Sequence, residues 1–294
     1  MKIYIVRHGE TDLNSKGVMQ GVLDVPLNQS GRDLAAVTGR AIRDIHFDCC
    51  ISSPLNRAVE TAEILLRESG NSVPLIIDDR IMEINCGAYE GRKLSEMGED
   101  GTLYFTDPFR FPGFPNGETI QDLCHRTQAF LKELIAKDDG KTWLVSTHGC
   151  AMRAMVNYLN DRPGEFWFGA IPYNCSMTII EAENGRPHII EVNRVYYDLN
   201  LTENPTESRW PTRFMSHLLL QRKARFLFLL RKILIKSADF QSKAAQQRFR
   251  AAQRSLRSRF RQGRFCKRAV QARTATKLQS KAIGRTWWAC LCTD

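Results

Sequence analysis

The chain has no uninterrupted apolar run of the roughly 20 residues that a membrane-spanning helix needs. It also has no recognisable secretory signal peptide, because Met1 leads almost at once into the strand-like segment IYIV. Its nine cysteines are an odd number without a regular spacing, so a disulfide-stabilised secreted fold is not expected. These absences predict a cytoplasmic protein with reduced thiols.

Acidic residues are scarce in the last third of the chain. Residues 202–294 contain 22 Lys and Arg but only four Asp and Glu, a net charge of +18. Residues 1–201 contain 20 basic and 28 acidic residues, a net charge of −8, and the two parts add up to the +10 of the whole chain. The sequence therefore predicts three parts: a domain over 1–201, a linker over 202–212 and a basic extension over 213–294 that is helical or disordered.

The basic extension has two possible explanations. Phe249, Leu256 and Phe260 recur at helical spacing among arginines, which suits a partner such as a nucleic acid or an anionic membrane surface. The apolar segment FLFLLRKILI at Phe226–Ile235 is too short and too charged to span a bilayer. Alternatively, the extension is an unselected addition from a fusion or a shifted reading frame, since like charge opposes compaction.

The predicted strands of the domain end in side chains that suit an anion. Residues 3–6 form a continuous apolar run typical of a buried parallel strand, and Arg7 and His8 follow it. Residues 47–52 form a second such run, and the helix expected at 55–68 carries Arg57 in its first turn.

A third run, at 142–146, ends just before His148 and Gly149, which open another helix. Because ligands of α/β proteins bind at the carboxyl ends of parallel strands, these three strand ends predict one shared anion site.

The remaining elements follow from local signals. Ser30 is expected to cap a helix that runs to about Arg43, and residues 118–137 are expected to form the longest helix. Residues 176–181 and 188–193 are expected to pair as a hairpin around Asn184-Gly185. Four histidines have no such context and are expected at the surface: His46, His125, His188 and His217.

Taken together, the motifs resemble those of the histidine phosphatase superfamily, which also contains the cofactor-dependent phosphoglycerate mutases. The resemblance covers about residues 1–200, in the family's order and spacing, and it implies a three-layer αβα sandwich around a mostly parallel, phosphoglycerate mutase-like sheet. The matching stretches are RHGETDLN (Arg7–Asn14), QGVLDVPLNQSG (Gln20–Gly31), SSPLNRAVETA (Ser52–Ala62), MEINCGAYEG (Met82–Gly91), NGET (Asn116–Thr119) and STHG (Ser146–Gly149).

Phosphate monoester chemistry suits these residue types. His8 would attack phosphorus and form a phosphohistidine, because neutral imidazole is a competent nucleophile at pH 7. Arg7 and Arg57 would bind the phosphoryl oxygens and disfavour protonation of His8. His148 would donate to a phosphoryl oxygen, and the backbone N–H groups at its helix N-terminus would add to the anion site.

A leaving alkoxide also needs a proton donor. The resemblance points to Glu83, in the segment that carries the family's general acid, and the chemistry calls for a carboxyl group of raised pKa. Glu10 and Glu90 are alternatives that we expect to be structural. The resemblance further implies substrate contacts from Asn14, Gln20, Gly21 and Gly149.

Two histidines and a glutamate could instead bind a metal ion. Arg7 would lie beside that cation, and these elements contain no HExxH motif and no Cys pair at zinc spacing. We therefore expect neither a metal nor a cofactor. Cys150, next to His148, is expected to fill core space as a small apolar residue.

The substrate is a small phosphorylated metabolite on this interpretation. The mutase branch carries a longer basic insertion between its acid segment and its NGET-like segment, whereas residues 92–116 are short and contain FRFPGFP. We therefore predict an aromatic, Pro-rich rim and a phosphatase. A mutase, or a relative that binds phosphate without turnover, is the alternative. Four aromatic residues of this stretch have two equally plausible roles, packing in the core or forming a lid over the substrate: Phe105, Phe109, Phe111 and Phe114.

Overall fold

The computed structural model of the protein describes residues 1–167 and 171–199. The predictions for the linker, for the basic extension and for His217 lie outside these described residues.

A six-stranded sheet forms the centre of the domain, with the strand order β3-β2-β4-β1-β5-β6. Strands β1, β2, β3 and β4 run parallel, and β5 and β6 add an antiparallel hairpin at one edge. The predicted mostly parallel sheet is therefore confirmed. The strands are β1 (Lys2–Arg7), β2 (Cys49–Ser52), β3 (Leu75–Ile77), β4 (Thr142–Thr147), β5 (Met177–Glu183) and β6 (Arg186–Arg194).

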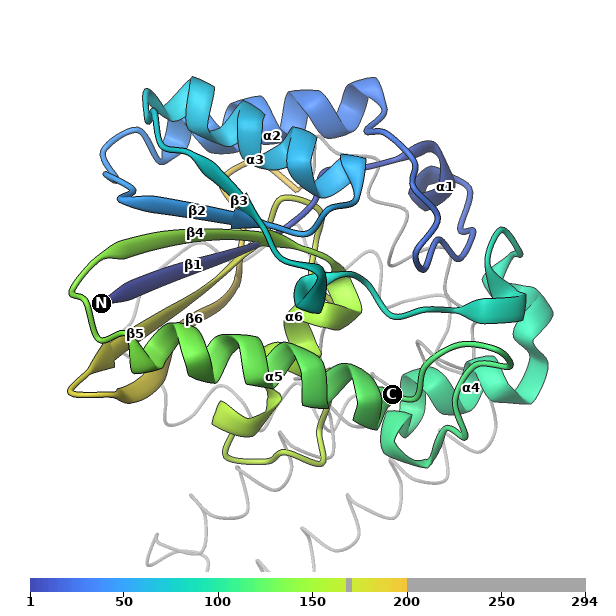
Figure 1. Ribbon diagram of the computed structural model, residues 1–294. Helices are drawn as coiled ribbons and strands as arrows, with labels where there is room; N and C mark the ends of the chain where they lie inside the picture. The colour runs from blue at the N-terminus through green and yellow to red at the C-terminus, as the bar shows by residue number, and fades with distance from the viewer. Residues whose placement is uncertain (168–170, 200–294) are drawn as a thin grey trace, which may run out of the picture. The chain divides into compact units, whose positions relative to one another are not determined.

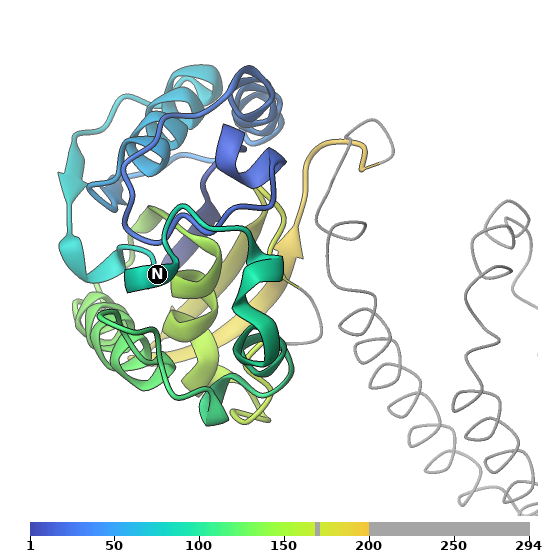
Figure 2. The ribbon, with the colours of Figure 1, turned by 90° about the vertical axis from the view of Figure 1, so that its right-hand side faces the viewer.

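Helices cover both faces of this sheet (Figure 1), with α2 and α3 on one face and α5 and α6 on the other. Figure 2 shows the same layers from the side, with the blue helices α2 and α3 at the top and the green helix α5 at the bottom. The helices are α1 (Asp12–Ser15), α2 (Gln29–Ala41), α3 (Asn56–Ser69), α4 (Gly98–Thr106), α5 (Ile120–Ala136) and α6 (Gly149–Val156). Short 3₁₀ turns lie at Asp79–Ile81, Gly87–Tyr89, Leu94–Met97, Pro108–Arg110 and Asn157–Leu159.

The two covered faces explain why the first strand is a continuous apolar run. Successive side chains of a strand point to opposite faces, so a strand buried on both faces needs apolar residues throughout. Ile3 and Ile5 pack with residues of α5 and α6, whereas Tyr4 and Val6 pack with residues of α3. Burial on both sides positions the Arg7-His8 pair that follows.

Element boundaries differ from the predictions where side chains form local hydrogen bonds. The first long helix starts at Gln29 rather than after Ser30, because the Asn28 side chain caps it by accepting from the Gly31 N–H at 2.8 Å. Strand β2 starts at Cys49 rather than at Phe47, whose N–H donates to the Asn71 side chain at 2.8 Å.

The predicted hairpin is present and longer than expected. Asn184 and Gly185 both adopt positive φ, at 52° and 69°, as a two-residue hairpin turn requires.

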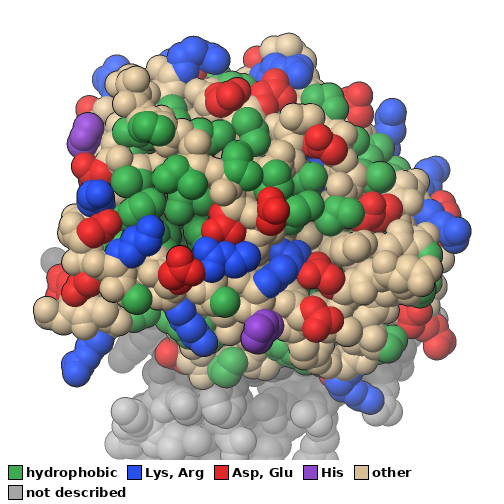
Figure 3. Space-filling model, in the orientation of Figure 1, with side chains coloured by type: hydrophobic (Ala, Val, Ile, Leu, Met, Phe, Trp, Pro, Cys, Tyr) green, Lys and Arg blue, Asp and Glu red, His purple; other side chains and the backbone are tan. Residues whose placement is uncertain are grey.

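Acidic, basic and apolar side chains are interspersed on the face shown in Figure 3. The edge strand β3 lies at the front of this view, and its Ile76 and Ile77 are 50% and 47% exposed. Within the part of the chain that the structure describes, no helix is both long and apolar enough to cross a bilayer.

Candidate active site

A pocket of about 380 Å³ lies at the carboxyl ends of β1 and β4 and collects the predicted site residues. All of them except His148 line it: Arg7, His8, Asn14, Gln20, Gly21, Arg57, Glu83 and Gly149. His148 is fully buried beside the pocket, with its ring centroid 5.1 Å from that of His8. The structure thus brings together residues that are up to 142 positions apart in the sequence, from Arg7 to Gly149.

His8 is held in one protonation state by its neighbours. Its Nδ1 lies 2.6 Å from the backbone oxygen of Gly9, and a carbonyl oxygen can only accept, so Nδ1 carries the proton and Nε2 keeps its lone pair. Burial lowers the pKa of His8 well below its ordinary value, and the charges of Arg57 and Arg7 lower it further. The side chain is therefore a neutral imidazole at physiological pH.

The loop after His8 is fixed by two residues that the sequence analysis did not identify. Asn174 donates from Nδ2 to the backbone oxygens of His8 and Gly9, at 2.9 and 3.1 Å. Thr61 of α3 accepts from the Gly9 N–H at 2.9 Å. Both contacts join segments far apart in the chain. Thr61 lies within the matching stretch SSPLNRAVETA (Ser52–Ala62), whereas Asn174 lies in none of the matching stretches.

Arg57 is 1% exposed and links α3 to the loop that follows α1. Its two terminal nitrogens donate to the backbone oxygens of Leu23 and Gly21, at 2.6 and 2.8 Å. Burial lowers its pKa to about 10, so the guanidinium remains charged at neutral pH. Arg57 Nε is buried without a hydrogen-bond partner among the described residues.

Arg7 is anchored in a similar way. One terminal nitrogen donates to the backbone oxygen of Pro172, and Nε is buried without a partner among the described residues. A Cβ at Gly149 would lie only 3.3 Å from Arg7 Nε, so the absence of a side chain there makes room for the guanidinium. Two fixed cations therefore lie in the wall of the pocket.

Ser53 determines which nitrogen of His148 can act on a ligand. His148 Nε2 lies 2.8 Å from Ser53 Oγ, and its Nδ1 is buried without a partner in the described part of the chain. If the Ser53 hydroxyl donates to Nε2, Nδ1 carries the proton. Burial lowers the pKa of His148 well below its ordinary value, helped by Arg57 and His8, so this second imidazole is also neutral.

Glu83 receives three backbone hydrogen bonds. The N–H groups of Ile84, Cys150 and Ala151 donate to its carboxylate, at 2.9, 3.1 and 3.0 Å. Two of the N–H groups at the start of α6 that were predicted to add to the anion site are therefore bonded to Glu83. Those of Cys150 and Ala151 point at Glu83, and only Gly149 and Cys150 of this turn line the pocket.

An ion pair between Arg126 and Glu118, which the sequence analysis did not identify, also holds the backbone of Glu83 in place. Arg126 of α5 donates to the backbone oxygens of Arg80, Met82 and Glu83, at 2.8–2.9 Å. Its other contacts are bonds of 2.7 and 2.8 Å to the carboxylate of Glu118. Glu118 lies within the NGET motif (Asn116–Thr119), and this motif was the sequence signal from which the ion pair could have been found.

The predicted contacts from the loop after His8 form a small network. The Thr11 hydroxyl donates to Gln20 Oε1 at 2.9 Å, and the Thr11 N–H donates to the amide oxygen of Asn14 at 3.2 Å. Gly21 adopts φ +51°, and a Cβ there would lie 2.2 Å from a carboxylate oxygen of Glu90, so glycine is required at this position.

The alternative carboxylates do not line the pocket. Glu10 accepts from the Asn28 side chain at 2.9 Å, and Glu90 accepts from the backbones of Val22 and Cys86 at 2.8 and 3.1 Å. His46, His125 and His188 are exposed. Among the described residues, no cluster of three His, Cys, Asp or Glu side chains is arranged to hold a metal ion.

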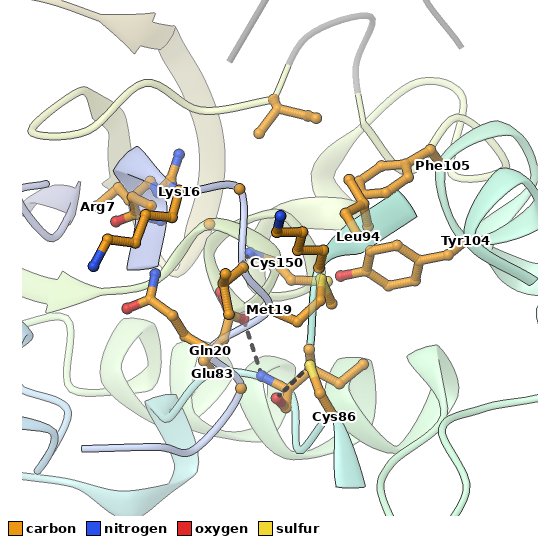
Figure 4. A pocket seen from close by; sticks show the side chains of 18 of the residues that line it. Arg7, Lys16, Met19, Gln20, Glu83, Cys86, Leu94, Tyr104, Phe105 and Cys150 are labelled. Atoms are coloured by element: carbon orange, nitrogen blue, oxygen red, sulfur yellow. Dashed lines mark hydrogen bonds between the residues drawn. The ribbon is translucent and has the colours of Figure 1, made fainter. Parts of the chain in front are cut away.

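One wall of the pocket is aromatic. Tyr104, Phe105 and Trp167 line it, and the first two lie on the opposite side from Arg7 and Lys16 (Figure 4). The predicted Pro-rich character is wrong, because no proline of the described residues lines the pocket, whereas Lys16 and Lys93 do.

The four phenylalanines in question mainly fill the core. Phe105, Phe111 and Phe114 are buried, Phe109 is partly buried, and all pack in one cluster with Tyr104. Phe105 alone among them also lines the pocket.

Two buried thiols, Cys86 and Cys150, also line the pocket. Burial raises the pKa of both thiols well above the ordinary value. Cys150 is 4% exposed and packs in the aromatic cluster, as expected for a small apolar residue.

Comparisons with known proteins agree with this geometry. The model of the histidine phosphatase superfamily (branch 1) matches residues 3–195. The chain is 32% identical over 164 residues to a 2,3-bisphosphoglycerate-dependent phosphoglycerate mutase of Cytophaga hutchinsonii. The aligned region covers 53% of this chain and 76% of the relative. It is also 32% identical over 199 residues to phosphoserine phosphatase 1 of Hydrogenobacter thermophilus, 66% of this chain and 92% of the relative.

Solved structures agree as well. Bacillus stearothermophilus YhfR superposes with a TM-score of 0.61 at 28% identity, over 66% of this chain and 97% of that one. A phosphoglycerate mutase from Bacillus anthracis superposes with a TM-score of 0.60 at 27% identity, over 66% of this chain and 92% of that one. The chain belongs to the histidine phosphatase superfamily.

Proposed function

We propose that this protein is a phosphatase that hydrolyses a small phosphorylated metabolite through a phosphohistidine on His8. One observation carries the proposal: the Nδ1–H of His8 is bound to the Gly9 carbonyl, which makes Nε2 the nucleophilic nitrogen of a neutral imidazole. Two anchored guanidinium groups, of Arg7 and Arg57, line the same pocket and match the charge of a phosphoryl dianion.

In the first step, His8 Nε2 attacks phosphorus and the bond from phosphorus to the ester oxygen breaks. The leaving oxygen takes a proton from Glu83. His148 would donate from Nδ1 to a phosphoryl oxygen, since Ser53 occupies its other nitrogen.

In the second step, water attacks the phosphohistidine. The Glu83 carboxylate accepts a proton from this water, the bond between phosphorus and Nε2 breaks, and inorganic phosphate leaves with neutral His8 restored. Each step uses side chains of this chain alone, so the proposed mechanism needs no metal ion or cofactor.

A phosphatase is favoured over a mutase by the rim of the pocket. The segment between Glu83 and the NGET motif contributes Lys93 as its only cation to the pocket, together with Tyr104 and Phe105. A cytoplasmic location is part of the proposal, and the six cysteines among the described residues are free thiols, which suits a reducing compartment.

The covalent step can be tested by labelling. Substrate labelled at phosphorus should leave label on the protein that is labile to acid and stable to alkali, as a phosphohistidine is. His8→Ala should abolish the label and lower activity on small phosphate esters by far more than tenfold. Persistent label in that variant, or activity within about tenfold of the unmodified protein, would contradict the assignment.

The same protein preparation distinguishes the mutase alternative. Supplied with 3-phosphoglycerate and 2,3-bisphosphoglycerate, a phosphatase should release inorganic phosphate, whereas a mutase should form 2-phosphoglycerate without net release. Interconversion faster than hydrolysis would make the mutase the better account.

A further inference from the structure

The segment that leads into β5 runs along the backbone of the nucleophile. Three of its residues are buried: Asn174, Cys175 and Ser176. The Cys175 N–H donates to the Arg7 carbonyl at 3.0 Å, and the Arg7 N–H donates to the Ser176 carbonyl at 3.1 Å. These two bonds hold the segment against the end of β1, so Asn174 lies beside the two residues that follow Arg7.

The side-chain amide of Asn174 contacts both of those residues. Its Nδ2 donates to the backbone oxygen of His8 at 2.9 Å and to that of Gly9 at 3.1 Å. Because a carbonyl oxygen can only accept, the NH₂ end of the amide must face these two groups, which fixes the orientation of the side chain. The Tyr197 hydroxyl donates to the backbone oxygen of Asn174 at 2.6 Å and holds the residue in place.

The Gly9 carbonyl accepts from Asn174 and also from Nδ1 of His8, and its two lone pairs allow both bonds. A Cβ at Gly9 would lie 2.6 Å from the Gly31 backbone oxygen, so glycine is required there. Glycine restrains its own backbone least of all residues. Contacts from elsewhere must therefore fix it: Thr61 accepts from the Gly9 N–H, and Asn174 donates to the Gly9 carbonyl.

We infer that Asn174 is a positioning residue that determines which nitrogen of His8 is the nucleophile. It keeps the Gly9 carbonyl turned toward Nδ1, and this carbonyl keeps the proton on Nδ1 and the lone pair on Nε2. Without the amide donor the carbonyl is free to turn away, and the imidazole can then carry its proton on Nε2. The inference rests on the proposed function for the role of His8 as nucleophile, but the position of the proton can be measured without turnover.

Nitrogen-15 NMR of the full chain measures that position. Long-range couplings from the ring protons distinguish a protonated from an unprotonated imidazole nitrogen, and the signals of His8 are those that His8→Ala lacks. At neutral pH, without phosphate, the unmodified protein should carry the His8 proton on Nδ1 alone. Asn174→Leu keeps the approximate size of the side chain and removes its donor, so His8 should show a measurable population with the proton on Nε2.

Steady-state kinetics provide the second measurement. A catalytic histidine held in the wrong tautomer loses up to about 10⁴-fold in kcat, and we expect a loss of about tenfold or more in Asn174→Leu, because Asn174 acts through the Gly9 carbonyl. KM should stay within about threefold, since other groups anchor Arg7 and Arg57. The loss should be equal on esters with good and poor leaving groups, because the proton donor Glu83 is unchanged.

Asn71→Leu is the matched control. The Asn71 amide also bonds backbone groups, donating to the Ile45 carbonyl at 2.9 Å and accepting from the Phe47 N–H at 2.8 Å, but Asn71 does not line the pocket. This variant should keep the tautomer of His8 and the kcat of the unmodified protein. Asn174→Ala removes the same donor with a smaller side chain, and it is measured in parallel in case Asn174→Leu folds poorly.

The outcomes separate this inference from the proposed function. His8 protonated on Nδ1 alone in both variants of Asn174 would overturn the inference even if the protein is a phosphatase. A shifted tautomer with unchanged kcat, or the same shift in Asn71→Leu, would overturn it as well. A shift confined to the variants of Asn174, without a phosphohistidine label on the unmodified protein, would support control of His8 by Asn174 and contradict the phosphatase.

Discussion

At the scale of single residues, each reacting group has a neighbour that sets its chemical form. The Gly9 carbonyl keeps the proton of His8 on Nδ1, the Ser53 hydroxyl occupies Nε2 of His148, and three N–H groups hold the Glu83 carboxylate. Such fixed orientation is what makes a site reactive, because groups already in place need no reorganisation during the reaction.

Replacing Glu83 by glutamine keeps the shape of the side chain and removes its proton. For esters with poor leaving groups, kcat should therefore fall by about 10²-fold or more, the usual scale of general acid catalysis. An activated ester such as 4-nitrophenyl phosphate should suffer less, since its leaving group departs without protonation. Steady-state kinetics on both ester types measure the difference. An equal loss of kcat on both would contradict the assignment of Glu83 as the proton donor.

A chelator serves as the control for this mechanism. EDTA should change the activity of neither protein, because each proposed step uses side chains alone. Strong inhibition that a divalent metal reverses would instead support the metal-site alternative.

The buried histidines should make stability depend on pH. His8 and His148 have pKa values well below their ordinary value in the folded protein, so only the unfolded chain binds protons as pH falls below about 6.5. The free energy of unfolding should thus fall below that pH, by up to about 1.4 kcal/mol per pH unit for each histidine, and should be insensitive to these groups above it.

Urea unfolding at several pH values, without phosphate, measures this effect. His148→Asn should flatten the dependence between pH 6.5 and 5, and His125→Asn, on the exposed face of α5, is the control. The same slope in His148→Asn and in the unmodified protein would contradict the buried neutral state.

At the scale of elements, two helices position Glu83 from opposite sides. Helix α6 donates the N–H groups of Cys150 and Ala151 to its carboxylate, and α5 holds its backbone through Arg126. Because His148 is the N-cap residue of α6, the same helix positions the second histidine and the proton donor.

Arg126 should therefore affect catalysis without touching substrate. Arg126→Met keeps much of the side-chain volume and removes five hydrogen bonds, three of them to the backbone near Glu83. The displaced carboxyl group should lower kcat by about tenfold or more on esters with poor leaving groups. A loss of stability alone would lower activity on all esters equally, so the ratio between ester types is the decisive measurement.

At the scale of the whole molecule, every described residue that lines the pocket lies between Arg7 and Ile171, and the family match ends at residue 195. A chain ending near Leu201 should therefore fold and keep kcat/KM within about threefold, less than roughly 0.7 kcal/mol of transition-state stabilisation. Thermal unfolding and steady-state kinetics test this. Loss of folding or activity would show that the basic extension contributes to the domain.

The basic extension is proposed to bind RNA or anionic liposomes. The full chain should bind one of these, the shortened chain should not, and binding should weaken steeply as salt rises from about 50 to 200 mM. Absent or salt-insensitive binding would favour an extension without a selected function.

Local patterns were sufficient for five of the six strands and for eight of the site residues that line the pocket, whereas the short strand β3 was not predicted. Apolar runs indicated β1 and β4, and the polar residues after them indicated where the site would form. Contacts between distant segments were not predictable in this way. Asn174, Thr61 and Arg126 hold the site through bonds that span up to 166 positions, and no periodicity marks them.

The same limit explains the errors. A short cap such as Asn28 competes with a neighbouring serine, and only the folded turn shows which side chain reaches the free N–H. The helix N-terminus at His148 has the sequence of an anion site, but Glu83 arrives from another segment and accepts its N–H groups.

Residues 16–19 pair through their backbone with residues 91–94 at the pocket, and this pairing has a consequence for the evolution of the protein. Its backbone bonds involve main-chain groups, so its side chains can be exchanged with little effect on the pairing. The reacting groups below are immobilised by other contacts. Lys16 and Lys93 line the pocket, so a library randomised at these two codons would vary the surface of the pocket and leave the reacting groups unchanged.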